Sequence, residues 1–299
     1  MFTVSLLSPA KINLFLAVTG RRADGFHDLL SLAAPVEFGD ELHARLTDVP
    51  GFVLECDDPT LATDESNLVI RAAMAFRREA PFGQGVRFVL KKRIPQGAGL
   101  GGGSSNAAST LLALNQLTGL PLTPEKLSAL AGEIGSDCAL FLDGGPVVMR
   151  GRGERIEPLA GMARNRLSGR KVWIFKPSVG VSTPWAYGML AAEAPRWYVP
   201  AAEAEQRLSA WIAGQLAPLS ALLSNSFEAV VFRKFVALPL LLKRLTDTFG
   251  LLTAMSGSGS ACYAFSSDSS EEGELAAGIG RVVREAWGKE ALVVETRLR

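Results

Sequence analysis

Apolar residues alternate with other residues in some parts of this chain and recur at helical spacing in others. Residues 12–18 alternate with a period of two, which predicts a strand. Residues 67–78 carry apolar side chains on one side of a helix. Similar patterns predict strands at 4–7, 29–38, 41–46, 52–55, 85–92, 147–150, 155–159, 172–175, 251–255, 261–265 and 292–296. They predict helices at 106–116, 123–135, from 182, and at 225–235, 240–249 and 271–287.

Strands mixed with helices, without regular alternation of the two, indicate an α+β fold with mixed sheets. Turn-rich residues 8–10 and 39–40 are predicted to separate neighbouring strands. The irregular polar stretch 161–169 predicts a boundary between an N-terminal domain, 1–160, and a C-terminal domain, 161–299. The Ala- and Trp-rich residues 194–216 fit no simple pattern and receive no role.

Composition narrows the class of protein. The 299 residues are 48% hydrophobic, and 31 Lys and Arg balance 30 Asp and Glu, which argues against a dedicated nucleic-acid or membrane-surface binder. Three widely spaced cysteines without a CxxC motif predict neither a disulfide framework nor a zinc site. With no signal-like N-terminus and no apolar run of transmembrane length, the chain is predicted to be cytoplasmic.

A glycine-rich stretch carries the strongest chemical signal. Five of the eight residues from Gly97 to Ser104 are glycine, and Ser104 and Ser105 then lead into the helix predicted at 106–116. A helix N-terminus offers unpaired N–H groups and partial positive charge, and glycine lets an anion approach them closely. The stretch therefore predicts a phosphate-binding loop. The alternative is a glycine-rich hairpin without a ligand.

Three known glycine motifs can be compared with this loop. The Walker motif fails because Gly103 is followed by two serines and not by Lys-Ser or Lys-Thr. The dinucleotide spacing is present, but no acidic residue follows about twenty positions later, so we treat that match as chance. The pattern Pro-x-x-x-Gly-Leu-Gly-x-x-Ser-Ser-x-Ala, which runs from Pro95 to Ala107, resembles the ATP loop of the GHMP small-molecule kinases.

Five further blocks occur in the order seen in that family, and the resemblance covers residues 8 to about 265. They are Ser8-Pro-Ala-Lys11-Ile-Asn13-Leu-Phe-Leu, Arg22-Ala-Asp-Gly25-Phe-His27, Asp64-Glu-Ser-Asn67-Leu, Gly135-Ser-Asp137 and Ser256-Gly-Ser-Gly259. The first two resemble the branch of the family that acts on a cytidine diphosphate conjugate of methylerythritol. The resemblance implies a two-domain GHMP kinase fold. It also implies ATP-dependent phosphorylation of the 2-hydroxyl of 4-diphosphocytidyl-2-C-methyl-D-erythritol, in the non-mevalonate pathway of isoprenoid biosynthesis.

The resemblance also implies roles for individual residues. Asp137 matches the catalytic aspartate that accepts the hydroxyl proton, and Lys11 matches the lysine that supports it. The ATP-binding positions are Asn67, Lys92, Pro95, Gly97, Gly99, Leu100, Gly101, Gly102, Gly103, Ser104 and Ser105. The substrate-binding positions are Asn13, Phe26, His27, Thr183 and Tyr187, with Phe26 and Tyr187 stacking on cytosine and His27 reading its edge. Mg²⁺ is expected on the ATP phosphates, without a dedicated protein cage.

Four of these residues also have a plainer interpretation. Lys11 would be a solvated lysine on an edge strand, His27 a structural histidine, Tyr187 a core residue, and Asp137 a turn residue. The chain departs from the family pattern at Cys138-Ala139, where Val-Pro is usual, and at Phe26, where Tyr is common.

Alternatives to the function also stay open. They are a GHMP kinase for homoserine, mevalonate or a sugar, and a non-catalytic nucleotide-binding relative. A monomer or weak homodimer is expected, with small-molecule partners and neither nucleic acid nor membrane.

Overall fold

The computed structural model describes residues 3–119, 122–216, 218–266 and 272–299, and it divides into two compact units. Each unit gathers segments that are separated in the sequence. Unit 1 comprises Met1–Ala10, Phe38–Pro95 and Gly101–Gly144. Unit 2 comprises Lys11–Glu37, Gln96–Leu100 and Gly145–Arg299. Residues 161–169, where the sequence predicts a boundary, lie inside unit 2, so these units partition the chain differently from a division after residue 160.

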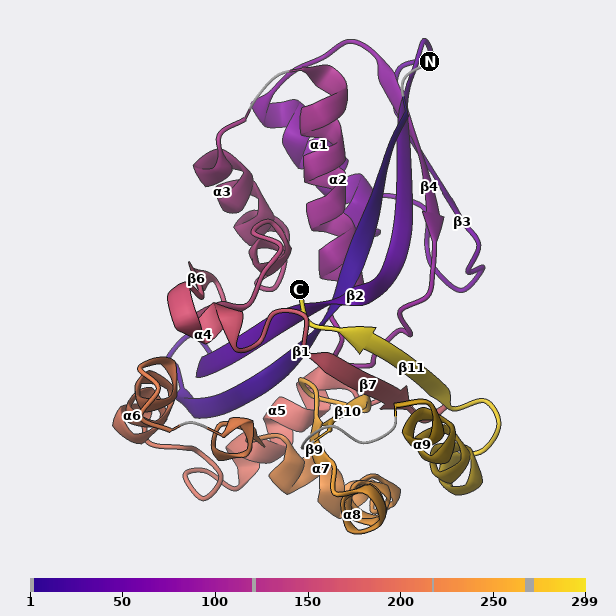
Figure 1. Ribbon diagram of the computed structural model, residues 1–299. Helices are drawn as coiled ribbons and strands as arrows, with labels where there is room; N and C mark the ends of the chain where they lie inside the picture. Colours follow the sequence, from indigo (N-terminus) through magenta and orange to yellow (C-terminus); the bar gives the residue numbers. More distant parts are fainter. Residues whose placement is uncertain (1–2, 120–121, 217, 267–271) are drawn as a thin grey trace. The chain divides into compact units, whose positions relative to one another are not determined.

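In unit 1, part of a seven-stranded mixed sheet carries three helices (Figure 1). β1 (Thr3–Arg21) and β2 (His27–Thr47) are long strands that each contribute residues to both units. β4 (Gly85–Lys91) pairs antiparallel with the second half of β2 and parallel with β3 (Phe52–Cys56). α1 packs on α2, on α3 and on β3. The helices are α1 (Leu68–Glu79), α2 (Gly102–Thr118) and α3 (Pro124–Ile134), followed by the 3₁₀ turn η1 (Ala139–Phe141).

Unit 2 contains a four-stranded antiparallel sheet in the order β11-β7-β10-β9. The first half of β2 pairs with the β5–β6 hairpin, and β1 pairs in parallel with the short β8. These strands are β5 (Val147–Gly151), β6 (Arg155–Pro158), β7 (Lys171–Lys176), β8 (Ser224–Asn225), β9 (Leu252–Met255), β10 (Cys262–Phe265) and β11 (Leu292–Arg297).

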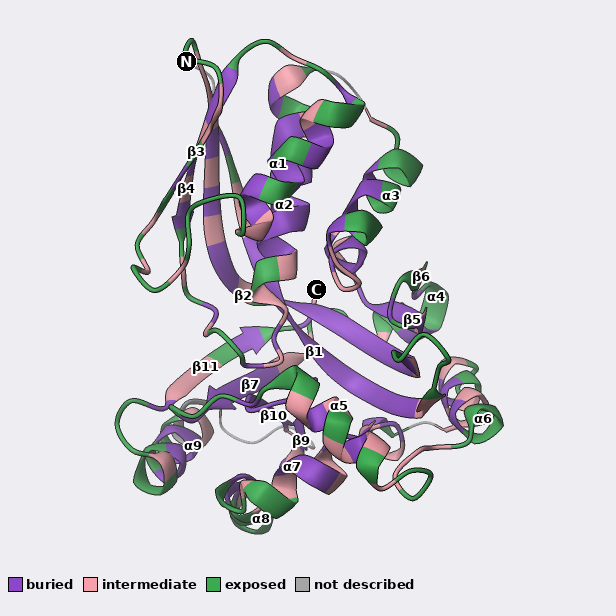
Figure 2. Cartoon of the chain, turned by 180° about the vertical axis from the view of Figure 1, so that it is seen from behind, coloured by how far each residue is buried: buried purple, intermediate pink, exposed green. Residues whose placement is uncertain are grey.

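Helices cover the four-stranded sheet of unit 2 and enclose its core. α8 packs on β9 and α9 on β11, and Figure 2 colours parts of both helices as buried. Trp173, Phe175, Phe227 and Leu245 are among the buried core side chains. The helices are α4 (Gly161–Asn165), α5 (Thr183–Ala192), α6 (Ala201–Ile212), α7 (Glu228–Lys234), α8 (Ala237–Phe249) and α9 (Glu272–Trp287), with the 3₁₀ turn η2 (Leu219–Ala221).

The α+β prediction is confirmed, but two predicted strand breaks are wrong. β1 and β2 run without interruption through residues 8–10 and 39–40. Gly39 permits close strand approach: a Cβ there would overlap the carbonyl oxygen of Ser8. The glycine that suggested a turn is therefore required for packing.

Several helix boundaries also differ from the sequence pattern. The helix predicted at 225–235 begins at Glu228, because Ser224 and Asn225 pair with β1. The helix predicted from residue 240 begins at Ala237. The unassigned stretch 194–216 contains α6, and the stretch expected to be irregular, 161–169, contains the short α4. The predicted start of the last helix, residue 271, lies outside the described residues, and α9 is described from Glu272.

Candidate active site

The glycine loop enters α2 in unit 1 as the sequence predicts. α2 begins at Gly102, and its N-cap residue Gly101 adopts a left-handed conformation with φ of 73°. Within the described residues no side chain caps this helix, and its first turn carries no acidic residue. The N–H groups of the first turn and the positive end of the helix dipole thus remain available to an anion.

The packing behind this helix start is tight. A Cβ at Gly102 would lie 3.0 Å from Cγ2 of Ile94, and one at Gly103 would lie 3.4 Å from Cδ1 of Leu68. The Ser105 hydroxyl is buried and has no hydrogen-bond partner within the described part of the chain. A buried hydroxyl of this kind at a helix N-terminus is suited to a phosphate oxygen.

Asp40 organises the entry to the loop, a role that the sequence did not reveal. Its fully buried carboxylate accepts hydrogen bonds from the backbone N–H groups of Arg93 (2.7 Å) and Ile94 (2.8 Å) and from the Asn106 amide (2.9 Å). It also forms an ion pair with Lys92, whose ammonium donates to Asn106 Oδ1 at 3.2 Å. One carboxylate therefore joins β2, the residues before Pro95 and α2. The sequence pattern Gly39-Asp40 had suggested only a turn.

Asp137 lies half-buried in the turn between α3 and η1, and η1 packs on both α2 and α3. The next residue, Cys138, is buried, and the Ser104 hydroxyl hydrogen-bonds its thiol. Burial raises the pKa of Cys138 to about 11, so the thiol remains neutral. The contact ties the turn that carries Asp137 to the first turn of α2. The chain has Ala139 where the family usually has a proline, and the backbone there still forms a 3₁₀ turn.

Asn67, predicted to contact ATP, is the N-cap of α1. Its Oδ1 accepts from the Val69 N–H at 2.9 Å, and its Nδ2 donates to the Ala62 carbonyl at 2.7 Å. Both polar atoms of this side chain therefore support the backbone. An adenine contact by Asn67 stays a prediction.

In unit 2, Lys11 and Asn13 form the centre of a buried polar network. Lys11 is 5% and Asn13 4% exposed, so the alternative of a solvated edge-strand lysine is wrong. The Lys11 ammonium donates to Asn13 Oδ1 at 2.5 Å. Asn13 Nδ2 donates to Ser31 Oγ at 2.9 Å, and Ser31 donates to the Phe15 carbonyl at 2.6 Å. This chain of bonds fixes the orientation of the asparagine amide and of the ammonium beside it.

The second glycine turn, residues 256–260, lies against residues 97–100 of the first. Ser256 Oγ donates to the Gly99 carbonyl at 3.0 Å, and the Ala261 N–H donates to the Ala98 carbonyl at 3.0 Å. Gly99 has φ of +77°, and a Cβ there would overlap the Ser256 carbonyl oxygen. Two turns far apart in the sequence therefore approach at a distance that glycine alone allows.

Lys11 and Thr183 both lie beside the second glycine turn. A Cβ on Gly257 would lie 3.4 Å from the Lys11 ammonium, and the Lys11 N–H donates to the Leu100 carbonyl at 2.9 Å. Thr183, the first residue of α5, shares a 2.7 Å hydrogen bond between its Oγ1 and Ser258 Oγ. The structure thus brings Lys11, Asn13, Thr183 and residues 97–100 together in unit 2.

Asn225 and Glu228 hold the backbone of the second glycine turn, and of Met255 before it, through hydrogen bonds. Asn225 Nδ2 donates to the carbonyls of Met255 and Gly257, each at 2.8 Å. Glu228 Oε1 accepts from the Met255 N–H at 2.8 Å. Burial raises the pKa of Glu228 to about 7. Neither residue stood out in the sequence, since an Asn and a Glu at the start of a helix are ordinary N-terminal residues.

The predicted cytosine-binding residues do not all contact one another. The His27 and Tyr187 rings stack at 4.8 Å between centroids, with 27° between their planes. Tyr187 also packs edge-on against Phe227. Phe26 is 56% exposed, and the Arg152 guanidinium lies 4.8 Å from its ring centroid. His27 and Tyr187 thus form a partly enclosed aromatic pair, with Phe26 on the adjoining loop.

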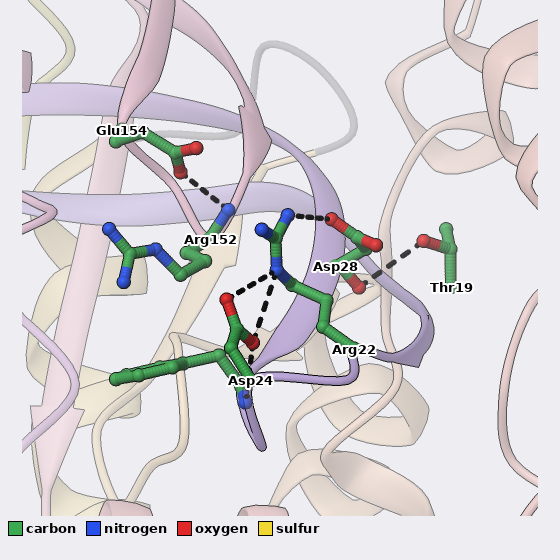
Figure 3. A network of polar contacts seen from close by, with 7 residues as sticks. Thr19, Arg22, Asp24, Asp28, Arg152 and Glu154 are labelled. Carbon is green, nitrogen blue, oxygen red and sulfur yellow. Dashed lines mark hydrogen bonds and ion pairs between the residues drawn. The ribbon is translucent and has the colours of Figure 1, made fainter.

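Ion pairs hold the loop that carries Phe26. Arg22 bridges Asp24 at 3.0 Å and Asp28 at 3.1 Å, and Thr19 Oγ1 donates to the Asp28 carbonyl (Figure 3). The Asp24 carboxylate also accepts from the Phe26 N–H at 3.1 Å. Backbone bonds between Arg22 and Phe26 and between Gly25 and Arg22 close the loop. These contacts fix the backbone of the loop at Phe26.

Comparison with known proteins gives the family. Residues 67–145 match the model of the GHMP kinases N terminal domain. A 4-diphosphocytidyl-2-C-methyl-D-erythritol kinase from Prochlorococcus marinus is 42% identical over 273 residues, which cover 89% of this chain and 85% of the relative. The chain belongs to the 4-diphosphocytidyl-2-C-methyl-D-erythritol kinase family. Membership makes the protein an ATP-dependent small-molecule kinase.

Other similarities agree with this membership. The family's enzyme from Synechococcus elongatus is 39% identical over 88% of this chain and 86% of its own length. A crystal structure of a 4-(cytidine 5′-diphospho)-2C-methyl-D-erythritol kinase aligns with a TM-score of 0.75 and 37% identity, over 98% of this chain and 99% of its own. A homoserine kinase from Cytophaga hutchinsonii has a TM-score of 0.76 at 22% identity, over 99% of this chain and 95% of its own, and shares the fold.

The described residues carry neither a membrane-spanning helix nor a cluster of metal ligands. None of their helices combines the length and the apolar character needed to cross a membrane. Nor do three or more of their His, Cys, Asp and Glu side chains converge as a metal-binding group.

Proposed function

We propose that this protein transfers the γ-phosphoryl group of ATP to the 2-hydroxyl of 4-diphosphocytidyl-2-C-methyl-D-erythritol, a step of the non-mevalonate route to isoprenoid precursors. The observation that carries the proposal is the uncapped, glycine-rich N-terminus of α2 in a chain of this kinase family. Its geometry suits the phosphates of ATP, and the relatives named for this substrate supply the acceptor.

Each site residue receives a role in this reaction. Asp137 accepts the proton of the 2-hydroxyl as the phosphoryl group arrives. The Lys11 ammonium, held by Asn13, offsets negative charge on the transferred group. The first-turn N–H groups of α2 and the Ser105 hydroxyl bind phosphate oxygens, while Lys92 supports the loop through Asp40.

Mg²⁺ fits this site as an ion carried by the nucleotide. Mg²⁺ in phosphoryl-transfer sites is commonly held by substrate phosphates and water with few protein carboxylates, and its charge lowers the cost of bringing a nucleophile to a triphosphate. The described residues offer no carboxylate cluster that would replace the phosphate ligands. Ser105 at the helix start and Asp137 in the neighbouring turn are the residues suited to orient the ion and its waters.

Cytosine selectivity is assigned to Phe26, His27 and Tyr187. Phe26 offers a largely exposed ring face, and the stacked His27–Tyr187 pair offers a second aromatic surface with a hydrogen-bonding edge. Bases stack on aromatic side chains, and each such contact contributes roughly 1–3 kcal/mol by alanine substitution.

The proposal is tested by measuring ADP release with Mg-ATP and, in parallel, the cytidine conjugate, mevalonate and homoserine. Wild-type protein should turn over the conjugate, and Phe26→Ala should raise KM for the conjugate about 5- to 150-fold with KM for ATP unchanged. Val236→Ala, which truncates a similarly exposed side chain at 59% exposure, serves as the control and should change neither constant. Turnover of mevalonate or homoserine in place of the conjugate would contradict the assignment.

A further inference from the structure

The segment between α5 and α6 carries an aromatic residue that reaches the predicted base-reading histidine. The Tyr198 hydroxyl and His27 Nε2 share a hydrogen bond of 3.1 Å, and the two rings meet edge-on with centroids 5.9 Å apart. Tyr198 lies in the stretch 194–216, which the sequence pattern left without a role. Its contact with His27 spans 171 residues of sequence.

The position of Tyr198 is set by its own segment. The N–H of Val199 donates to the Val18 carbonyl at 3.0 Å, which docks the segment on β1. The N–H of Tyr198 donates to the Pro195 carbonyl at 3.0 Å. The Trp197 indole donates to Glu193 at 3.1 Å, and Glu193 also forms an ion pair with Arg233. These bonds hold the backbone on either side of Tyr198, and none of them involves His27.

His27 is constrained on several sides. Tyr187 stacks on its ring face, Tyr198 meets its Nε2, and the residue is buried. Burial and the nearby Arg21 lower the pKa of His27, which favours the neutral imidazole. A neutral imidazole has one nitrogen that donates and one that accepts, and a partner on one nitrogen decides which is which. A phenol O–H is a stronger donor than a neutral imidazole N–H, so the tyrosine donates to Nε2.

We propose that Tyr198 is a positioning residue that holds His27 in the Nδ1–H tautomer and in a fixed ring plane, and so sets the hydrogen-bonding pattern offered to the pyrimidine of the substrate. The inference rests on the proposed function for its substrate, a cytidine diphosphate compound. The bond between the two side chains itself does not depend on that function. Without the tyrosine hydroxyl, His27 would sample both tautomers, and a part of the population would present the wrong pattern to the base.

The structure suggests a direct spectroscopic test, because His27 and His43 are the two histidines of the chain. Long-range ¹H–¹⁵N spectra of histidine-labelled protein report which ring nitrogen carries the proton. A His43→Gln variant assigns the two sets of signals. His27 should show the Nδ1–H tautomer in the wild type and a tautomer mixture in Tyr198→Phe, while the His43 signals stay unchanged. A proton on Nε2 in the wild type, or spectra that Tyr198→Phe does not alter, would overturn the proposal.

Binding and kinetics give the second readout. With cytidine 5′-diphosphate as the probe, Tyr198→Phe should weaken binding about 3- to 10-fold, as expected for one lost hydrogen bond. KM for the conjugate should rise by the same factor, with kcat and KM for ATP unchanged. Trp287→Phe is the matched control, since it removes an indole hydrogen bond to the Ala237 carbonyl, outside the segment that carries Tyr198, and keeps the tyrosine hydroxyl.

The outcomes separate the positioning role from the proposed function. Unchanged cytidine 5′-diphosphate affinity in Tyr198→Phe, or an equal loss in Trp287→Phe, would overturn the positioning role. If the conjugate is not a substrate at all, the proposed function fails, but the tautomer of His27 still decides whether Tyr198 positions it.

Discussion

The carboxylate of Asp40 accepts a hydrogen bond from the side-chain amide of Asn106 at 2.9 Å, and this bond joins strand β2 to helix α2. The same carboxylate accepts two backbone N–H groups from the start of the glycine loop and pairs with Lys92. Asp40 is fully buried, so these partners replace the water that a carboxylate otherwise requires. The loop and the helix that would bind ATP phosphates thus share one buried anchor.

Removing the charge of Asp40 should destabilise the protein strongly. Asp40→Asn leaves the Lys92 ammonium, whose side chain is 9% exposed, without its anionic partner. Breaking a buried ion pair in this way costs about 3–5 kcal/mol, which urea denaturation would measure. The double variant Asp40→Asn/Lys92→Met should recover part of the loss. Purely additive effects of the two substitutions would show that the pair is not coupled.

Two glycines of the loop should respond differently to the same substitution. Gly97 and Gly99 both have positive φ, but a Cβ on Gly97 would have no neighbour within 4 Å, whereas one on Gly99 would overlap the Ser256 carbonyl. Gly97→Ala should therefore cost about 1 kcal/mol from backbone strain. Gly99→Ala should cost more and should raise KM for ATP at least tenfold, because the two glycine turns must separate. Equal effects in thermal unfolding and ATP kinetics would contradict the close approach.

Asp137→Asn should reduce kcat by about 10²- to 10⁴-fold with little change in the affinity for either substrate. The substitution keeps the size of the side chain but removes the proton acceptor. Calorimetric titration of the two substrates, beside steady-state kinetics, separates binding from turnover. Cys138→Ala, which removes the bond to Ser104 from the next position, is the control for a displaced turn. Near-normal kcat in Asp137→Asn would exclude the general-base role.

Glu228 should make stability depend on pH. Its pKa is raised from the usual 4.5 to about 7 by burial, so the folded state binds the proton more tightly than the unfolded state. This stabilising contribution is complete below about pH 4.5 and is lost as the pH rises through 7. Glu228→Gln keeps an oxygen for the Met255 N–H without the buried charge. Its melting temperature should match that of the wild type near pH 5 and exceed it by about 2–4 °C at pH 8.

The titratable neighbours of Glu228 do not interfere with this experiment, and a second variant serves as its control. Cys262 and Tyr263 lie near Glu228 in the buried core, and burial raises the pKa of both well above their usual values, so neither titrates over this range. Glu228→Ala, which leaves the Met255 N–H without its acceptor, should be less stable than Glu228→Gln at every pH. A pH-independent difference between Glu228→Gln and the wild type would argue that the carboxyl is ionised throughout.

Much of this protein follows from local sequence. The α+β class, the glycine loop and its junction with α2 follow because glycine content, N-cap serines and apolar periodicity act over a few neighbouring residues. The predictions failed where a local signal had a distant cause. Gly39 resembles a turn glycine, yet it is needed because Ser8 on β1 lies against it. Lys11 could be a surface lysine by its alternation alone, and the fold excludes that alternative by burying the side chain beside Asn13.

The motif residues of the family occur in order along the chain, so the chemistry that this protein performs can be predicted from the sequence. The contacts that support these residues can be found only in the folded structure. These supporting residues come from segments that are remote in sequence from the residues they contact. They are Asp40, which anchors the loop, Asn225 and Glu228, which hydrogen-bond the backbone at the second glycine turn, and Tyr198, which contacts His27. The physical reason is that a hydrogen bond or a close backbone approach depends on distance in space. A pattern read along one segment carries no information about which distant segment will lie beside it.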